Sequence, residues 1–395
     1  MNATADKKLR TRNYNTWLRV FIAMELHRLL IYGAAFTIMG LSNAVIPILP
    51  ELANLSNNSS GGFALSLLFS AYFLGALGTM LPFGILADRF GNFKFIALGI
   101  ILTVISGLTI LLSKNLWILL IARFIEGSAC GAFLPASFAI LSKLNNPGRY
   151  LGELTFLFNA GLATGAFLSG LLADTYLKGA ILVFTILTFL LTIYLFSRHR
   201  RLADPEISEK ASALKNSDLF RKPYRETKKL LSRSNIGLWL SSFLLNGAIG
   251  VLVAYYPDYS LGTITKTQLG ISISSLYVCA MITSLFGGHF KVKEKTLIRI
   301  GLGFSALGAL SAIKYPLLGF SSLGGGSGVA TVGFALAVAR MNTDRGLAMG
   351  FFNTTIYAGL SFAPIIAGIF IDFVSFEKLF IANGCILAVG IILKS

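Results

Sequence analysis

The sequence predicts an all-α integral membrane protein with twelve transmembrane helices, arranged as two six-helix bundles related by pseudo-symmetry. Three observations predict it: few charged residues, twelve long apolar stretches and a weak internal repeat. Of the 395 residues, 55% are hydrophobic and 13% are charged, and the mean hydropathy is +0.73. Because a soluble domain carries about 25% charged residues, this chain cannot cover a water-soluble surface, which excludes a soluble enzyme, a coiled coil and a disordered chain.

The apolar stretches have the length of helices that cross a bilayer. Such a helix needs about 20 mostly apolar residues, whereas a barrel strand needs about ten with alternating polarity. The stretches are continuously apolar, so helices are expected. The expected spans are 29–50, 62–84, 94–113, 115–142, 150–174, 178–197, 235–257, 266–288, 296–313, 316–340, 346–371 and 375–393.

The basic residues predict the orientation of these helices. The net charge is +17. If the N-terminus lies inside, every Lys and Arg except the intrahelical Arg123 falls inside, apart from one lysine in each of five outer loops: Lys114, Lys178, Lys266, Lys314 and Lys378. The positive-inside rule then places both termini in the cytoplasm, in a plasma or inner membrane. The same distribution marks the basic residues as topology determinants and disfavours nucleic acid as a partner.

A repeat divides the chain near its midpoint. Glycines of the fifth and eleventh spans match at an offset of 198: Gly152 with Gly350, Gly161 with Gly359 and Gly170 with Gly368. Two related halves are typical of transporters in which the halves rock about a central substrate site. The expected domains are a cytoplasmic N-terminal segment 1–28, a first bundle 29–197, a cytoplasmic linker 198–233 and a second bundle 234–395.

The turn after the second span carries a motif. It reads Gly84-Ile-Leu-Ala-Asp88-Arg89-Phe-Gly91-Asn-Phe-Lys94 and resembles the G-x-L-A-D-R-x-G-x-x-K signature of the major facilitator superfamily. We expect Gly84 and Gly91 to permit a tight turn and close helix approach, Asp88 to lie at a helix N-terminus, and Arg89 and Lys94 to hold the turn at the cytoplasmic side. The resemblance implies that these five residues form a conformational latch rather than a substrate site.

The fourth span contains two ionisable residues. Arg123-Phe-Ile-Glu126-Gly127 resembles the R-x-x-Q-G motif of the same superfamily, with Glu at the Gln position. Counted from Asn115 at ~1.5 Å per residue, Glu126 lies about 16 Å into the bilayer, where ionisable groups are costly and usually functional. Either Glu126 carries a proton under the influence of Arg123, or the i,i+3 pair only neutralises Arg123.

Two further sets of residues are candidates. The fifth and eleventh spans resemble a degraded form of the antiporter motif G-x-x-x-G-P-x-x-G-G of the superfamily, although small residues at this spacing also serve helix packing alone. These are Gly161, Gly165, Gly170, Gly359, Pro364 and Gly368. Polar residues within spans could line a substrate cavity or form interhelical hydrogen bonds: Asn43, Tyr72, Asn159, Asn246, Asn353 and Tyr357.

The sequence contains no P-loop, HExxH or GxSxG motif and no Cys/His cluster, so we expect neither an enzyme nor a bound metal or cofactor. The resemblance implies a monomeric secondary transporter in the lipid bilayer that exports small amphipathic compounds in exchange for protons by alternating access. Two alternatives remain: a proton symporter or uniporter that imports a sugar, organic acid or peptide, and a non-transporting membrane sensor with the same fold.

Overall fold

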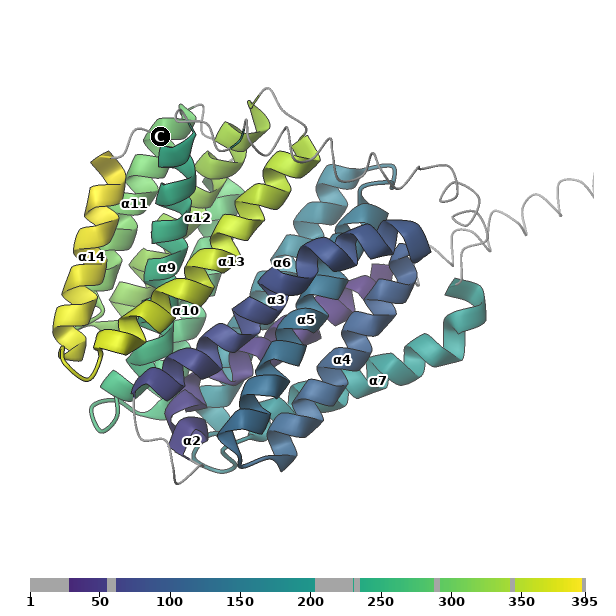
Figure 1. Cartoon of the computed structure of the whole chain (residues 1–395), viewed down its shortest axis with the longest axis horizontal. Coiled ribbons are helices and arrows are strands. Elements are labelled where there is room, and N and C mark those ends of the chain that lie inside the picture. Colours follow the sequence, from purple (N-terminus) through teal and green to yellow (C-terminus); the bar gives the residue numbers. More distant parts are fainter. Residues whose placement is uncertain are drawn as a thin grey trace, which may run out of the picture.

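A computed structural model describes residues 28–54, 62–202, 230, 235–287, 292–341 and 345–392, and all regular structure within them is helical (Figure 1). The expected N-terminal segment 1–28, except Arg28, and most of the expected linker 198–233 lie outside the described residues. After a first helix over residues 28–44, the elements are η1 (Ile46–Ile48), α2 (Leu49–Asn54), α3 (Gly62–Phe90), α4 (Asn92–Leu112), α5 (Leu116–Leu141), α6 (Pro147–Leu172), α7 (Gly179–Leu202), α9 (Ile236–Tyr259), α10 (Lys266–Gly287), α11 (Glu294–Ser311), α12 (Pro316–Ala339), α13 (Arg345–Phe370) and α14 (Phe376–Ile392).

The predicted all-helical membrane fold is confirmed. Ten segments of the described chain are long and apolar enough to cross a membrane, and the two remaining predicted spans correspond to α11 and α14, with 18 and 17 residues. The first span differs from its prediction, because it is broken rather than continuous. The helix over 28–44 gives way to η1 at Ile46–Ile48, where Pro47 lacks the N–H group that a continuous helix needs.

The helices pack as two groups that follow the two halves of the sequence. In the first half, α5 packs against α3 and α4, and α4 also contacts α7. In the second half, α12 packs against α10 and α11, while α9 contacts α13 and α14. The main contacts between the halves join α3 to α13 and α6 to α10 (Figure 1).

The two ends of the helices differ in how the halves meet. We call the end near residues 202 and 235 the linker end, and the opposite end, with α2 and the start of α3, the far end. At the far end, a Cβ atom added to Gly170 of α6 would lie 2.4 Å from the Lys266 carbonyl oxygen, and one added to Gly368 of α13 would lie 2.5 Å from Ser66 Oγ. Nothing lies within 4 Å of such an atom at Gly148, Gly152 or Gly350, toward the linker end. The halves therefore touch closely at the far end, whereas these three glycines toward the linker end face open space.

Ion pairs follow the same asymmetry. Among the described residues, the pairs at the linker end join groups of one half: Glu153 with Arg28 and Arg149 in the first half, and Arg340 with Glu294 in the second. At the far end, Lys266 of α10 forms an ion pair with Glu51 of α2 and so connects the two halves.

Candidate functional site

The most deeply buried charges lie in α5. Arg123 and Glu126 have side chains that are 1% and 0% exposed, and Arg123 Nη1 donates to Glu126 Oε2 over 2.7 Å. Because a buried charge is tolerated only when it is paired and hydrogen-bonded, each member of this pair needs the other. Among the described residues, Arg123 Nη2 and Glu126 Oε1 have no hydrogen-bond partner, so each keeps unused bonding capacity.

Arg123 also connects three helices of the first half. Its Nη1 donates to the Ser42 carbonyl oxygen of the first helix, and its Nε donates to the Leu68 carbonyl oxygen of α3, both over 3.3 Å. The ring of Tyr72 lies against the guanidinium group, with its centroid 5.0 Å from Cζ, a cation–π geometry. A displacement of Arg123 therefore acts on the first helix and on α3 as well as on α5.

Close contact between α3 and α5 makes this geometry possible. A Cβ atom added to Gly127 would lie 1.7 Å from the Tyr72 carbonyl oxygen, and one added to Gly75 would lie 2.2 Å from the Phe124 carbonyl oxygen. Small residues at helix contacts let the backbones approach in this way. Gly127 of the Arg123 motif thus brings α5 near enough to α3 for the arginine to reach Leu68.

Side chains of both halves meet next to this pair. Cys130, one turn beyond Glu126 in α5, lies with its Sγ 3.6 Å from the Tyr357 hydroxyl of α13. Tyr277 of α10 donates to Asn43 Oδ1 over 3.3 Å, while Asn43 Nδ2 donates to the Leu162 carbonyl oxygen over 2.8 Å. The buried ion pair is therefore one helical turn from a contact between the halves.

The structure brings together only part of the predicted cavity set. Tyr72 and Tyr357 are buried and both approach Phe73, with ring centroids 4.9 and 6.1 Å from its centroid. In contrast, the amides of Asn159 and Asn246 donate back to carbonyl oxygens of their own helices. Both side chains are half-buried, as is that of Asn353 in α13. Their predicted role in a cavity stays a prediction.

The sequence reasoning missed Tyr277 and Cys130 as site residues. A signal for Tyr277 was available, because Ser275-Leu276-Tyr277 repeats the pattern of Ser70-Ala71-Tyr72 in the corresponding helix of the other half. Cys130 carried no such signal, since a cysteine within an apolar helix is usually a packing residue.

The predicted latch residues lie around the turn between α3 and α4. Gly91 has φ +101°, a conformation that favours glycine. Gly84 instead lies within α3, where an added Cβ would meet Pro135 at an ordinary 3.5 Å. The expectation that Asp88 lies at a helix N-terminus is wrong, because α3 continues to Phe90 and Asp88 falls in its last turn. Asp88, Arg89 and Lys94 are exposed, and their role as a latch stays a prediction.

The predicted packing residues lie at helix contacts. Added Cβ atoms at Gly161 and Gly165 would approach the Phe36 and Gly40 carbonyl oxygens of the first helix to 2.4 and 2.2 Å, and one at Gly359 would approach the Phe243 carbonyl oxygen of α9 to 2.5 Å. A Cβ atom added to Gly170 would approach the Lys266 carbonyl oxygen of α10 to 2.4 Å. The last two members lie in α13 near Tyr255, which donates to the carbonyl oxygen of Pro364 and whose hydroxyl lies 2.7 Å from a Cβ added to Gly368.

Two of the five predicted outer-loop lysines make specific contacts. Lys178 donates to three carbonyl oxygens at the end of α4, those of Ile110, Leu111 and Ser113, over 2.7 to 3.2 Å. Lys266 donates to the Pro47 carbonyl oxygen over 2.9 Å and pairs with Glu51 over 2.6 Å. The remaining three are exposed: Lys114, Lys314 and Lys378.

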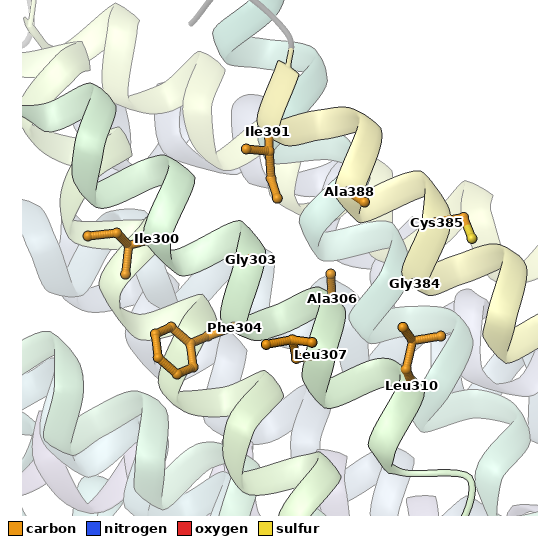
Figure 2. Close-up of a pocket in the computed structure, with 10 residues that line it drawn as sticks. All are labelled: Ile300, Gly303, Phe304, Ala306, Leu307, Leu310, Gly384, Cys385, Ala388 and Ile391. Carbon is orange, nitrogen blue, oxygen red and sulfur yellow. The ribbon is translucent and has the colours of Figure 1, made fainter.

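An apolar groove of about 520 Å³ lies between α11 and α14 (Figure 2). Figure 2 shows Ile300, Phe304 and Leu307 of α11 along one side and Ile391 and Cys385 of α14 along the other. Binding sites for solutes usually contain a few polar groups that fix orientation, and the side chains that line this groove are apolar. The ion pair and the tyrosines between the halves are thus the better candidate site.

Comparison with known proteins identifies the family. Relatives include an uncharacterized MFS-type transporter of Methanocaldococcus jannaschii, 24% identical over 90% of this chain and 94% of its own. They also include the class H tetracycline resistance protein of Pasteurella multocida, 25% identical over 67% of this chain and 68% of its own. The quinolone resistance protein NorA of Staphylococcus aureus is 25% identical over 63% of this chain; the match spans 61% of NorA.

The fold is also that of a solved transporter. The crystal structure of a point mutant of the nucleoside transporter NupG superposes with a TM-score of 0.75, at 12% identity, over 92% of this chain and 98% of that one. The family model described as Major Facilitator Superfamily matches residues 31–264 and 238–394. With the whole described fold and both halves of the sequence accounted for in this way, the chain belongs to the major facilitator superfamily of transporters.

Proposed function

We propose that this protein is a proton-coupled exporter of small amphipathic compounds, in which Glu126 carries the exchanged proton. One observation carries the proposal: a fully buried Arg123–Glu126 ion pair lies one turn from the contact between Cys130 and Tyr357 that joins the halves. Ionisable groups inside membrane helices are costly and mark proton or substrate pathways. The tetracycline and quinolone resistance proteins among its relatives support this substrate class.

We propose that the linker end faces the cytoplasm, as the distribution of basic residues predicts. The structure then corresponds to a state that is closed toward the outside and open toward the cytoplasm. In the alternating-access cycle, substrate enters from the linker end, the halves rock, and the far end opens to release it. Protonation of Glu126 would weaken its bond to Arg123 and so loosen the tie of Arg123 to the first helix and α3.

The test is transport by the purified full-length protein in liposomes that contain a pH-sensitive dye. Tetracycline and a quinolone are the first substrates to apply outside the vesicles. Antiport makes the interior alkaline as substrate enters, symport makes it acidic, and uniport leaves its pH unchanged. An acidic or unchanged interior during substrate uptake would refute proton-coupled export.

The role of Glu126 is tested with Glu126→Gln. We expect this variant to exchange labelled for unlabelled substrate across the membrane while it loses substrate-driven proton movement. Glu294→Gln is the matched control, because Glu294 pairs with Arg340 at the edge of the second half and away from the site. Proton movement at the wild-type rate in Glu126→Gln would refute the carrier role and leave neutralisation of Arg123 as its function.

A further inference from the structure

At the far end, charged side chains join the two halves, and the proposed proton step does not involve them. Lys266, the first residue of α10, reaches from the second half to the first and holds it at two points. Its Nζ lies 2.6 Å from Glu51 Oε1 and 2.9 Å from the Pro47 carbonyl oxygen. The side chains of Lys266 and Glu51 are 17% and 29% exposed, so this contact is much less hydrated than a surface ion pair and correspondingly stronger.

A second carboxylate lies close to the same lysine. Asp258, in the last turn of α9, is half-buried and near enough to Glu51 and Lys266 for their charges to act on it. It belongs to the same half as Lys266 and precedes it by eight residues, across the turn that contains Gly262. Among the described residues Asp258 forms no ion pair within 4 Å, and Glu51 Oε2 is buried without a hydrogen-bond partner. The charge of Lys266 therefore acts on two carboxylates, and in this structure it pairs with Glu51.

The two carboxylates belong to different halves. Opening of the far end therefore moves Glu51 away from Lys266, whereas Asp258 stays in the same half as the lysine. When the far end is closed, Lys266 can reach Glu51 across the interface. When the far end opens, Glu51 and Pro47 move away with the first half, and Lys266 loses both of its contacts across the interface. Asp258 moves with Lys266 and can then accept the ion pair.

We propose that Lys266 is the gating residue of the far end, and that it exchanges Glu51 for Asp258 when the halves separate there. The exchange keeps the lysine paired in both states, so the far end closes through a specific contact and opens without leaving an uncompensated charge. This inference rests on the alternating-access movement in the proposed function, but not on the substrate or on proton coupling.

The test measures the distance between the halves at the far end. Nitroxide labels are placed at Tyr176 and Leu261, which are exposed residues of the two halves at this end, after Cys279 and Cys385 are replaced by alanine. Cys130 is buried and is kept, because it contacts Tyr357 of the other half. Pulsed electron paramagnetic resonance on the full chain in lipid nanodiscs then gives the populations of short and long distances.

Lys266→Gln is expected to raise the ratio of long to short distances by about tenfold, because two charge-assisted hydrogen bonds of the closed state are lost. Glu51→Gln should raise the same ratio, and adding Asp258→Asn to Glu51→Gln should bring it back toward the wild-type value. The charge swap Lys266→Glu with Glu51→Lys should restore the short distance. Lys178→Gln is the matched control, because Lys178 lies at the same end but bonds only within the first half.

A wild-type distance distribution in Lys266→Gln refutes the gate. If Asp258→Asn has no effect in the Glu51→Gln background, the exchange of partners is refuted. If saturating tetracycline changes the distances while substitutions of Lys266 do not, the alternating-access movement is supported and the gating role of Lys266 is refuted. A shift in Lys266→Gln with no substrate flux in liposomes would support the gate and refute the proposed transport.

Discussion

Gly127 allows a direct test of how the ion pair is positioned. In Gly127→Ala the new methyl carbon would stand 1.7 Å from the Tyr72 carbonyl oxygen and 2.7 Å from its carbonyl carbon. Both are backbone atoms of α3, so no side chain can rotate to relieve the contact. Reaching an ordinary separation requires α3 and α5 to move apart by about 1.5 Å, a large shift for a packed helix pair.

The cost follows from two effects. Overpacking of a close-packed interior costs about 1–3 kcal/mol. A separation of this size would also break the bond from Arg123 Nε to the Leu68 carbonyl oxygen, which is already 3.3 Å long, and hydrogen bonds to charged groups contribute about 1.5–3 kcal/mol. Because the helices can share the strain, we expect a net loss of about 3 kcal/mol, or roughly 5–10 °C in Tm for a folding unit of this size.

The assay is thermal unfolding of the purified protein in detergent, followed by tryptophan fluorescence. Gly78→Ala is the matched control, since Gly78 lies in the same helix pair on α3 and has nothing within 4 Å of an added Cβ. We expect this control to unfold at the wild-type temperature or slightly above it, because alanine favours a helix by about 0.5–1 kcal/mol over glycine. The reasoning is refuted if Gly127→Ala unfolds at or above the wild-type temperature.

Two further predictions concern the ends of α4. Gly91→Ala should destabilise the protein by about 1–3 kcal/mol, because an alanine is strained at φ +101°. The strain comes from the backbone alone, since nothing lies within 4 Å of the added Cβ. The control is Gly148→Ala, at a helical glycine that also has nothing within 4 Å of an added Cβ, and equal Tm values for the two variants would contradict this prediction. At the other end, burial and then the charge of Lys114 lower the pKa of Lys178. Between this lowered value and the ordinary one, the unfolded chain binds more protons than the folded one. The free energy of unfolding should therefore rise with pH across that window and be constant below the lowered pKa and above the ordinary one. Lys178→Met should flatten this dependence in thermal unfolding between about pH 7 and 11, and an unchanged difference between variant and wild type across that range would oppose it.

The fold could be predicted because the membrane imposes a strong and local pattern. Each long apolar run must form its own backbone hydrogen bonds, so its presence is visible without knowledge of its neighbours. The ends of helices are less visible, since they depend on single residues. The signature around Asp88 suggests the start of a helix, whereas α3 extends through it to Phe90, and the break at Pro47 is hidden within one apolar run.

The site could be predicted only where its chemistry is carried by side chains in an unusual place. Arg123 and Glu126 stand out because they are charges in an apolar run. Their backbone partners, the carbonyl oxygens of Ser42 and Leu68, have no sequence signature, because every residue has a carbonyl group. Lys266 was missed for a related reason: in the sequence it looks like the exposed Lys114 or Lys314, and only its reach across the interface distinguishes it.

The break in the first helix explains why both charged contacts lie where they do. The helix over 28–44 ends just before η1, and the two cations bind carbonyl oxygens on either side of this point: Arg123 that of Ser42 and Lys266 that of Pro47. A carbonyl oxygen has two lone pairs and accepts a second donor most readily where the regular helix is interrupted. Arg123 belongs to the same half as this segment, whereas Lys266 comes from the opposite half. The short stretch from Ser42 to Glu51 is therefore attached to the buried pair on one side and to the interface on the other, so a shift of either cation acts on the same piece of backbone.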